Sequence, residues 1–510
     1  MRIAVKEPYF GDSPTGAPMV CVHHPTDCVL LEDEVLENEG GLNGAPISPG
    51  MLTMEPSCRA DKIEVQSSSL GGRGVFAKQK ITVGETILFE KSLAMSSTAD
   101  ATAYEPGMEN ALVGATTNAR KLALLQQLVD RVLPNPALSS KFFSLYAGES
   151  TSQGTNGTDI EGVFNTYTAL SIIQHNCHTI FPGNASAHHD PHHSPKNSPK
   201  LCLSDQRPGI WLQASMFNHC CLPNASWSWI GDLFVVKANR DIASGEEITV
   251  AYVPSSYDHD MRQKTLKAAN DFECICVLCK ADASATRSTE SKDALKKAQR
   301  LEAYARGNFL GQKPAISPED LVRKAVACYS SPQYDGLPSI QLAEPFHQLA
   351  HILLGPHQSW RTNFTPKLAD LELQSKAKAC FCACVEVALG YRLVVEPGAG
   401  YCELLPSAHA QPKPVGVLAL MGLAELAFLD HNKYHSRALR ACAKTLYGIW
   451  YGEDATFKKQ HGYYLCAKEN ALEERDVPLK APSGAEWQAL KERRMAEKVE
   501  VPSFLREDGA

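Results

Sequence analysis

The chain has 510 residues, of which 44% are hydrophobic and 21% are charged, so a large folded core spread over two or three domains is expected. Its 50 basic and 57 acidic side chains give a formal net charge of -7, which excludes the composition of a general nucleic-acid-binding protein. The sequence has no secretory signal and no run of about 18 apolar residues that would span a bilayer, so we expect a soluble intracellular protein. In that setting its 17 scattered cysteines are expected as thiols or metal ligands, not as disulfides.

The first strand-like pattern begins near residue 61. Residues 1–57 mix Gly, Pro and Ser with an acidic patch and show no sustained period, which predicts a disordered leader. Residues 62–65 then alternate between apolar and polar side chains, and two further strand-like runs follow at 74–77 and 87–90. Consecutive strands with short connections predict a small β-meander.

Two helical segments and a loop come next. Apolar residues recur at helical spacing from 119 to 146, interrupted at Pro134 and Pro136, and again from 164 to 173. The stretch 182–208 is of low complexity and contains four histidines between 188 and 193. Imidazoles bind metals, but Pro and Ser surround these four without a scaffold, so a solvated loop is the favoured interpretation.

Strand patterns return in the middle of the chain, and helical patterns fill the rest. The predicted strands are 225–229, 232–238 and 247–252, with a turn at 243–246 between the last two. Beyond residue 284 we expect an all-α C-terminal domain, 284–510; a superhelical repeat array is an alternative, although no strict period is present. The clearest helical runs are 321–328, 377–387, 417–429 and 436–449, and the last two are typical of an antiparallel helical hairpin.

Three closely spaced cysteines carry the strongest chemical signal. Cys274, Cys276 and Cys279 form a C-x-C-x-x-C cluster, which places three thiolates within reach of one tetrahedral zinc ion. If Cys221 supplies the fourth ligand, the site is a closed cage of the structural kind. The alternative is a group of unrelated buried cysteines, which spacing this tight disfavours.

The segment Asn218-His219-Cys220-Cys221-Leu222-Pro223-Asn224 concentrates side-chain donors and acceptors next to apolar residues. Polar groups in such a setting hold a ligand or cap a turn. From residue types alone, His219 is a catalytic base, a metal ligand or a hydrogen-bonded core histidine. A zinc hydrolase that uses the histidine-rich loop is disfavoured, because the chain has no H-E-x-x-H motif or comparable ligand set.

Four motifs in order resemble the SET-domain protein lysine methyltransferases. The chain looks most like the SMYD group and its fungal relatives, in which a helical insertion splits the SET domain. No cysteine lies between Ser92 and Phe164, so the zinc-binding MYND module of that group is absent. The resemblance implies an α+β SET fold of short curved sheets with a threaded segment. The motifs are 72–77, 218–224, 243–252 and 272–279. The resemblance further implies a SET domain at 58–256, split by an insertion at about 93–163, then a post-SET zinc segment at 257–283 and the helical domain.

The same resemblance assigns roles to individual residues. Tyr252 matches the active-site tyrosine, and Phe272 matches the aromatic residue that stacks on the adenine of S-adenosylmethionine. The zinc is implied to be structural and to be held by Cys221, Cys274, Cys276 and Cys279. The residues implied to contact the cofactor are Gly72, Arg73, Gly74, Asn176, Asn218, His219, Tyr252 and Phe272.

The function implied by the resemblance is methyl transfer from S-adenosylmethionine to a lysine of a histone or another basic protein. Such a protein is expected in the nucleus or the cytoplasm, as a monomer, without direct binding to nucleic acid or membrane. Asn270 and His178 depart from the family, since aromatic residues are common at both positions. These departures keep open the alternative of a catalytically weak SET-fold scaffold that binds partners.

Overall fold

The computed structural model describes residues 2–5, 19–23, 28–31, 61–96, 113–148, 164–180, 207–230, 233–305, 316–354, 371–396, 401–450, 457, 482 and 484–506. The chain divides into two compact units. The first comprises Met1–Pro254 and Asp260–Cys274, and the second comprises Ser255–His259 and Ile275–Ala510. Within the described ranges, every helix is too short or too polar to cross a lipid bilayer.

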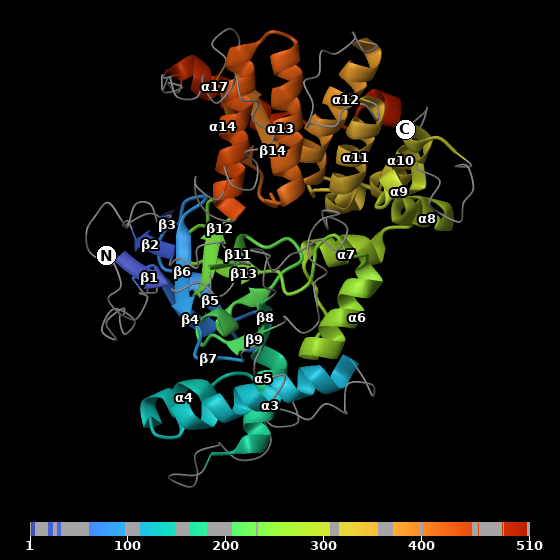
Figure 1. Ribbon diagram of the computed structural model, residues 1–510. Helices are drawn as coiled ribbons and strands as arrows, with labels where there is room; N and C mark the ends of the chain where they lie inside the picture. The colour runs from blue at the N-terminus through green and yellow to red at the C-terminus, as the bar shows by residue number, and fades with distance from the viewer. Residues whose placement is uncertain are drawn as a thin grey trace, which may run out of the picture. The chain divides into compact units, whose positions relative to one another are not determined.

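Short sheets make up the centre of the first unit (Figure 1). In the four-stranded sheet, β13, β5 and β4 pair antiparallel, and β10 adds to the edge of β13 in parallel. The four-stranded sheet runs in the order β10 (Asn218–His219), β13 (Glu247–Val250), β5 (Arg73–Ala77) and β4 (Ile63–Ser67). Two further sheets have three strands each. One runs in the order β11 (Ala225–Ile230), β12 (Leu233–Ala238), β6 (Thr86–Lys91), and the other in the order β7 (Ala94–Met95), β9 (Arg207–Ile210), β8 (His178–Ile180).

The expected β-meander is wrong in one pairing. Strand β4 pairs with β5 as expected, but β6 pairs with β12 in a different sheet, where Phe89 lies opposite Val235. Every residue of β12 is buried, so this strand needs a partner on each edge, and β6 fills one of them. Large apolar side chains such as Trp211 and Phe217 are completely enclosed by these strands and form the core.

The insertion is helical, as the sequence predicts. Helices α3 (Val113–Val132), α4 (Pro136–Phe143) and α5 (Thr166–Asn176) pack on one another through a second apolar cluster. Helix α4 begins where the sequence predicted a break: Pro136 occupies its first turn, and the Asn135 side chain accepts a hydrogen bond of 3.1 Å from the Leu138 amide. The histidine-rich residues 188–193 lie outside the described residues, and β9 occupies the end of the predicted low-complexity loop.

The cysteine cluster follows one helix and extends into the next, and more helices follow. Helix α6 (His259–Asn270) precedes Cys274, and α7 (Val277–Ser284) begins at Cys276, which is its N-cap residue. The C-terminal region is helical, and in Figure 1 α13 and α14 run side by side. Its helices are α8 (Thr289–Ala298), α9 (Leu301–Ala305), α10 (Pro318–Val326), α11 (Ala343–Leu354), α12 (Leu371–Ala383), α13 (Pro414–Leu429), α14 (Lys433–Trp450) and α17 (Ala485–Ala496).

Two strand groups lie where the sequence predicted none. A hairpin of β14 (Tyr391–Val395) and β15 (Cys402–Pro406) interrupts the C-terminal helices directly after a π-helical turn at Cys384–Ala388. Near the N-terminus, within the predicted leader, β1 (Arg2–Val5), β2 (Met19–His23) and β3 (Cys28–Leu31) form an antiparallel sheet. In residues 1–57, the Gly, Pro and Ser content had outweighed the short apolar runs and led to the prediction of a disordered leader.

Candidate active site

The glycine-rich turn between β4 and β5 is open on one side. Gly72 adopts a left-handed backbone conformation with φ of +61°, and no protein atom lies within 4 Å of the position that a Cβ would occupy. The Ser68 amide donates to the Gly72 carbonyl at 3.1 Å and so closes the turn. Arg73 is exposed, and its guanidinium donates to the Ser144 carbonyl in the insertion. The backbone of Gly72 is therefore accessible, whereas the Arg73 side chain is turned toward the insertion.

Asn218 lies beside this turn because β10 and β5 both flank β13. Its amide nitrogen donates to the Arg73 carbonyl at 2.9 Å and to Glu247 Oε1 at 2.7 Å. Gly74 is essential for this arrangement, since a Cβ there would lie 2.1 Å from Glu247 Oε1 and 2.9 Å from Asn218 Nδ2. The predicted contact of Gly74 with a ligand is thus accompanied by close contact with the protein's own side chains.

His219 is buried and has both ring nitrogens engaged. Nδ1 accepts a hydrogen bond of 2.9 Å from the Tyr252 amide, so the neutral ring carries its hydrogen on Nε2, which lies 3.3 Å from Cys221 Sγ. Of the three roles that residue type allowed, the hydrogen-bonded core histidine fits this geometry. The imidazole connects the Tyr252 backbone to a cysteine of the predicted metal cage.

Tyr252 is held by its hydroxyl as well as by its backbone. The phenol donates a 2.5 Å hydrogen bond to the Phe217 carbonyl. Burial raises the pKa of Tyr252, and the nearby Glu247 carboxylate raises it further, so the side chain stays a neutral phenol at physiological pH. Its ring centroid lies 5.3 Å from that of His219 and 6.3 Å from that of Phe272, edge-on to the latter. Three predicted site residues from separate segments therefore form one aromatic group.

Phe272 reaches this group through a tight bend after α6. Helix α6 ends at Asn270, and Asp271 follows in a left-handed conformation with φ of +62°. Beyond Phe272, the Gln263 side chain holds both backbone groups of Cys274: it accepts from the amide at 2.9 Å and donates to the carbonyl at 2.8 Å. The bend thus places an aromatic ring and a cysteine on the same short stretch.

Asn176 has a structural use in this conformation. It lies at the end of α5, is buried, and donates to the Tyr146 carbonyl at 2.7 Å and to the Ile172 carbonyl at 2.8 Å. Both of its amide hydrogens are thereby committed to backbone acceptors. The predicted contact of Asn176 with a cofactor stays a prediction.

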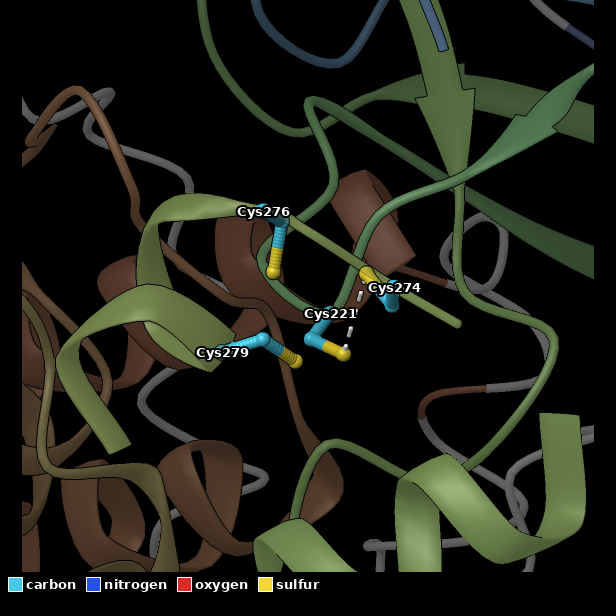
Figure 2. Close-up of side chains that lie close together, drawn as sticks. All are labelled: Cys221, Cys274, Cys276 and Cys279. Atoms are coloured by element: carbon cyan, nitrogen blue, oxygen red, sulfur yellow. Dashed lines mark hydrogen bonds between the residues drawn. The ribbon is translucent and has the colours of Figure 1, made fainter. Parts of the chain in front are cut away.

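Four cysteines converge at the second predicted site. Figure 2 shows the side chains of Cys221, Cys274, Cys276 and Cys279 directed toward a common space, and their sulfur atoms all lie within 4.8 Å of one another. Four sulfurs bound at 2.3 Å to one tetrahedral ion would lie about 3.8 Å apart, and Cys221 Sγ lies 3.9 Å from Cys274 Sγ. Both the donor set and the spacing fit zinc, and a site without an open position fits a structural role.

The two positions that depart from the family have distinct environments. His178 lies among the rings of Trp211, Trp227, Trp229 and Phe234, with the centroid of Phe234 5.0 Å away. Desolvation lowers its pKa to about 4, so it is a neutral aromatic ring at pH 7. Asn270 donates to the His175 carbonyl at 3.4 Å and so links the end of α6 to α5.

Two residues that organise the site were not among the predicted site residues. Asn224 is buried and holds the start of β13. Its amide donates to Glu246 Oε1 at 3.0 Å, just before the strand, and to the Glu247 carbonyl at 2.8 Å, and its Oδ1 accepts from the Thr249 amide at 2.8 Å. Glu247 is the other, through Asn218. Both residues lie inside motifs that the sequence analysis quoted, but nothing in one sequence separates a ligand contact from an internal brace.

Residues 72–253 match the SET domain family. The chain therefore contains a SET domain, which confirms the resemblance that the four motifs indicated. The observed α+β arrangement of short sheets with a helical insertion and a helical C-terminal region agrees with it.

Curated relatives of this chain carry methyltransferase names. A protein of Gibberella zeae named methyltransferase is 25% identical over 226 residues, which cover 42% of this chain and 30% of that protein. The histone-lysine N-methyltransferase set5 of Schizosaccharomyces pombe is 32% identical over 133 residues, covering 25% of this chain and 40% of the relative. Human histone-lysine N-methyltransferase SMYD3 is 34% identical over 104 residues, covering 19% and 24% respectively. The chain thus spans less than half the length of each of these relatives.

Proposed function

We propose that this protein transfers a methyl group from S-adenosylmethionine to a lysine side chain of another protein, with histones and other basic proteins as the candidate substrates. The observation that carries the proposal is the grouping of Tyr252, Phe272 and His219 beside the SET-family strands, with the Tyr252 hydroxyl held by a backbone carbonyl. The names of the relatives and the net charge of -7, which favours a basic partner, support it.

The residues around the turn fit the proposed cofactor. The accessible backbone at Gly72 allows close approach of a ligand, and the Asn218 amide retains its carbonyl oxygen as an acceptor. Phe272, only partly buried, provides a ring face for a purine. When bound, the cofactor supplies a methyl group activated by its positively charged sulfur.

Tyr252 is the proposed catalytic residue. Its hydroxyl hydrogen is committed to the Phe217 carbonyl, so the phenol oxygen presents lone pairs to whatever lies in front of it. Such an oxygen orients a lysine amine and stabilises positive charge near it, which accelerates the reaction by positioning and by a preorganised field. Apolar surroundings along the proposed path of the lysine would lower its pKa and favour the neutral amine that attacks the methyl group.

Zinc is proposed as a structural ion held by Cys221, Cys274, Cys276 and Cys279, as their spacing supports. The partner is proposed to be the protein substrate, without direct binding to nucleic acid or membrane. The proposed oligomeric state is a monomer, in the nucleus or the cytoplasm. The boundaries of the SET domain, the post-SET segment and the helical domain stay as predicted from the sequence.

Radiolabelled methyl transfer into a panel of histones and into whole-cell extract tests this function. Tyr252→Phe should reduce labelling by about 100-fold because the oriented oxygen is lost, while the affinity for S-adenosylhomocysteine should fall by no more than about threefold, since the ring is kept and only the hydrogen bond to the Phe217 carbonyl is lost. Tyr167→Phe, at an exposed tyrosine of α5, is the matched control and should retain full activity.

The alternative of a catalytically weak scaffold gives a different pattern. In that case the wild-type protein binds S-adenosylhomocysteine but labels no protein above the level of Tyr252→Phe. Absence of cofactor binding in the folded wild-type protein would exclude both the enzyme and the proposed pocket.

A further inference from the structure

Glu247, the first residue of β13, is the centre of a small polar group on the four-stranded sheet. Ser68 Oγ donates to both of its carboxylate oxygens, at 2.9 Å and 2.8 Å, and Asn218 Nδ2 donates to Oε1 at 2.7 Å. Ser68, Asn218 and Glu247 all remain partly exposed to solvent. Within the described part of the chain, no lysine or arginine forms an ion pair with this carboxylate, so neutral donors bind it and its negative charge is not cancelled.

The two donated bonds determine which way the Asn218 amide points. Both hydrogens of Nδ2 have acceptors, the Arg73 carbonyl and Glu247 Oε1. Rotating the amide by half a turn would place its oxygen against these two acceptors, which is unfavourable for both contacts. Glu247 therefore helps to fix the amide so that Asn218 Oδ1 is directed away from these two acceptors.

Strand pairing and one glycine make room for this contact. Glu247 lies opposite Phe76 on β5, and Asn218 lies opposite Thr249 on the other side of β13. Any side chain at position 74 would displace the carboxylate, because a Cβ there would lie 2.1 Å from Oε1. The carboxylate is thus held in a space that the backbone of β5 leaves open, next to the accessible Gly72 turn.

We propose that Glu247 is a positioning residue for the amino-acid end of the cofactor: it orients Asn218 so that Oδ1 accepts from the ligand's ammonium group, and its own charge attracts that ammonium. This inference rests on the proposed function. It assigns Glu247 no contact with the methyl group and no proton transfer. This role predicts a selective effect: replacing Glu247 should lower the affinity only for ligands that carry the ammonium group.

Two ligands separate this role from a general structural one. S-adenosylhomocysteine carries the amino-acid end, whereas 5′-methylthioadenosine shares the nucleoside and thioether but lacks it. Titration calorimetry on the full chain should show that Glu247→Ala weakens S-adenosylhomocysteine by about 10- to 50-fold, the range expected for a lost charge-assisted contact, and changes 5′-methylthioadenosine by less than twofold. Glu247→Gln, which still accepts from Asn218 through its amide oxygen, should recover part of the lost affinity.

Two further variants keep the test decisive. Ser68→Ala removes one neutral donor without changing the charge and should weaken S-adenosylhomocysteine by about threefold, so it replaces Glu247→Ala if that variant does not fold. Glu64→Ala, at an exposed carboxylate on β4 of the same sheet, should leave both affinities unchanged.

Equal weakening of both ligands, or no weakening of S-adenosylhomocysteine, would overturn the role of Glu247 while leaving the proposed function intact. Failure of the folded wild-type protein to bind either ligand would instead remove the proposed function, and this inference with it.

Discussion

The SET portion and the C-terminal helices are stabilised by different means. In the SET portion, buried polar side chains such as His219 and Asn224 form hydrogen bonds to backbone groups of neighbouring strands. In the helical region, α13 has apolar side chains buried on all sides, and its packing depends on shape, as where Gly422 lies against the Phe381 ring. A lost polar contact leaves a buried group without its partner, whereas a packing defect costs energy without changing a specific chemical group.

Disrupting the cysteine cage should give the largest effect on the stability of the SET portion. Cys274→Ser should abolish stoichiometric zinc binding and lower the free energy of unfolding of the SET portion by about 4 kcal/mol or more, since metal binding is coupled to folding. Metal analysis and thermal denaturation measure both effects. Cys220→Ser, at the neighbouring cysteine outside the cluster, should keep the zinc content. If a chelator leaves thermal stability and S-adenosylhomocysteine binding untouched, the cage is not structural.

Substitutions at two glycines test how packing stabilises the C-terminal helices. An added Cβ at Gly422 in α13 would lie 2.6 Å from the Phe381 ring, so Gly422→Ala should destabilise the C-terminal region by about 2 kcal/mol through overpacking. Gly448 in α14 has no atom within 4 Å of the same position, so Gly448→Ala should stabilise it by about 0.5–1 kcal/mol through helix propensity. Denaturant titration should show changes of opposite sign in the free energy of unfolding for the two variants. The affinity for S-adenosylhomocysteine should be unchanged in both. Shifts of the same sign would contradict this packing.

His178 gives an effect that appears only at acidic pH, and it combines both kinds of stabilisation. Its pKa is lowered to about 4 in the folded protein from an ordinary value of 6.5, so below pH 6.5 the unfolded chain binds the proton more readily. Stability should therefore fall as the pH decreases from 6.5 toward 4, by about 1 kcal/mol per pH unit from this residue. His178→Phe should remove that part of the dependence, measured as the difference between the unfolding free energies of the two proteins at each pH. A constant difference would show that His178 does not stay neutral in the fold.

Local patterns in the sequence predicted most elements, whereas pairings over long distances were missed. The strands at β4, β5, β11 and β12 were predicted because apolar alternation is a local property. The partner of β6 was not, since its register depends on the fully buried β12 more than 140 positions later in the chain. The hairpin of β14 and β15 is a local pairing and was missed for another reason: its apolar residues directly continue those of the preceding helix.

The candidate site shows the same limit at the level of single residues. The grouping of Cys221 with Cys274 followed from the family resemblance, because no spacing rule connects positions so far apart. Motif matching identified Asn218 and Tyr252 as site residues but gave no hint that Glu247 and Asn224 brace them. Bracing depends on the direction of a side chain in a folded sheet, and neighbouring residues in a motif point to opposite faces.

The space at Gly74 also bears on how this sequence can vary. A methyl group at position 74 would occupy the present place of the Glu247 carboxylate, although the two positions are distant in the chain. Gly74→Ala should therefore force the Glu247 side chain to move and disturb the orientation of the Asn218 amide, so a substitution in β5 would act on a residue of β10.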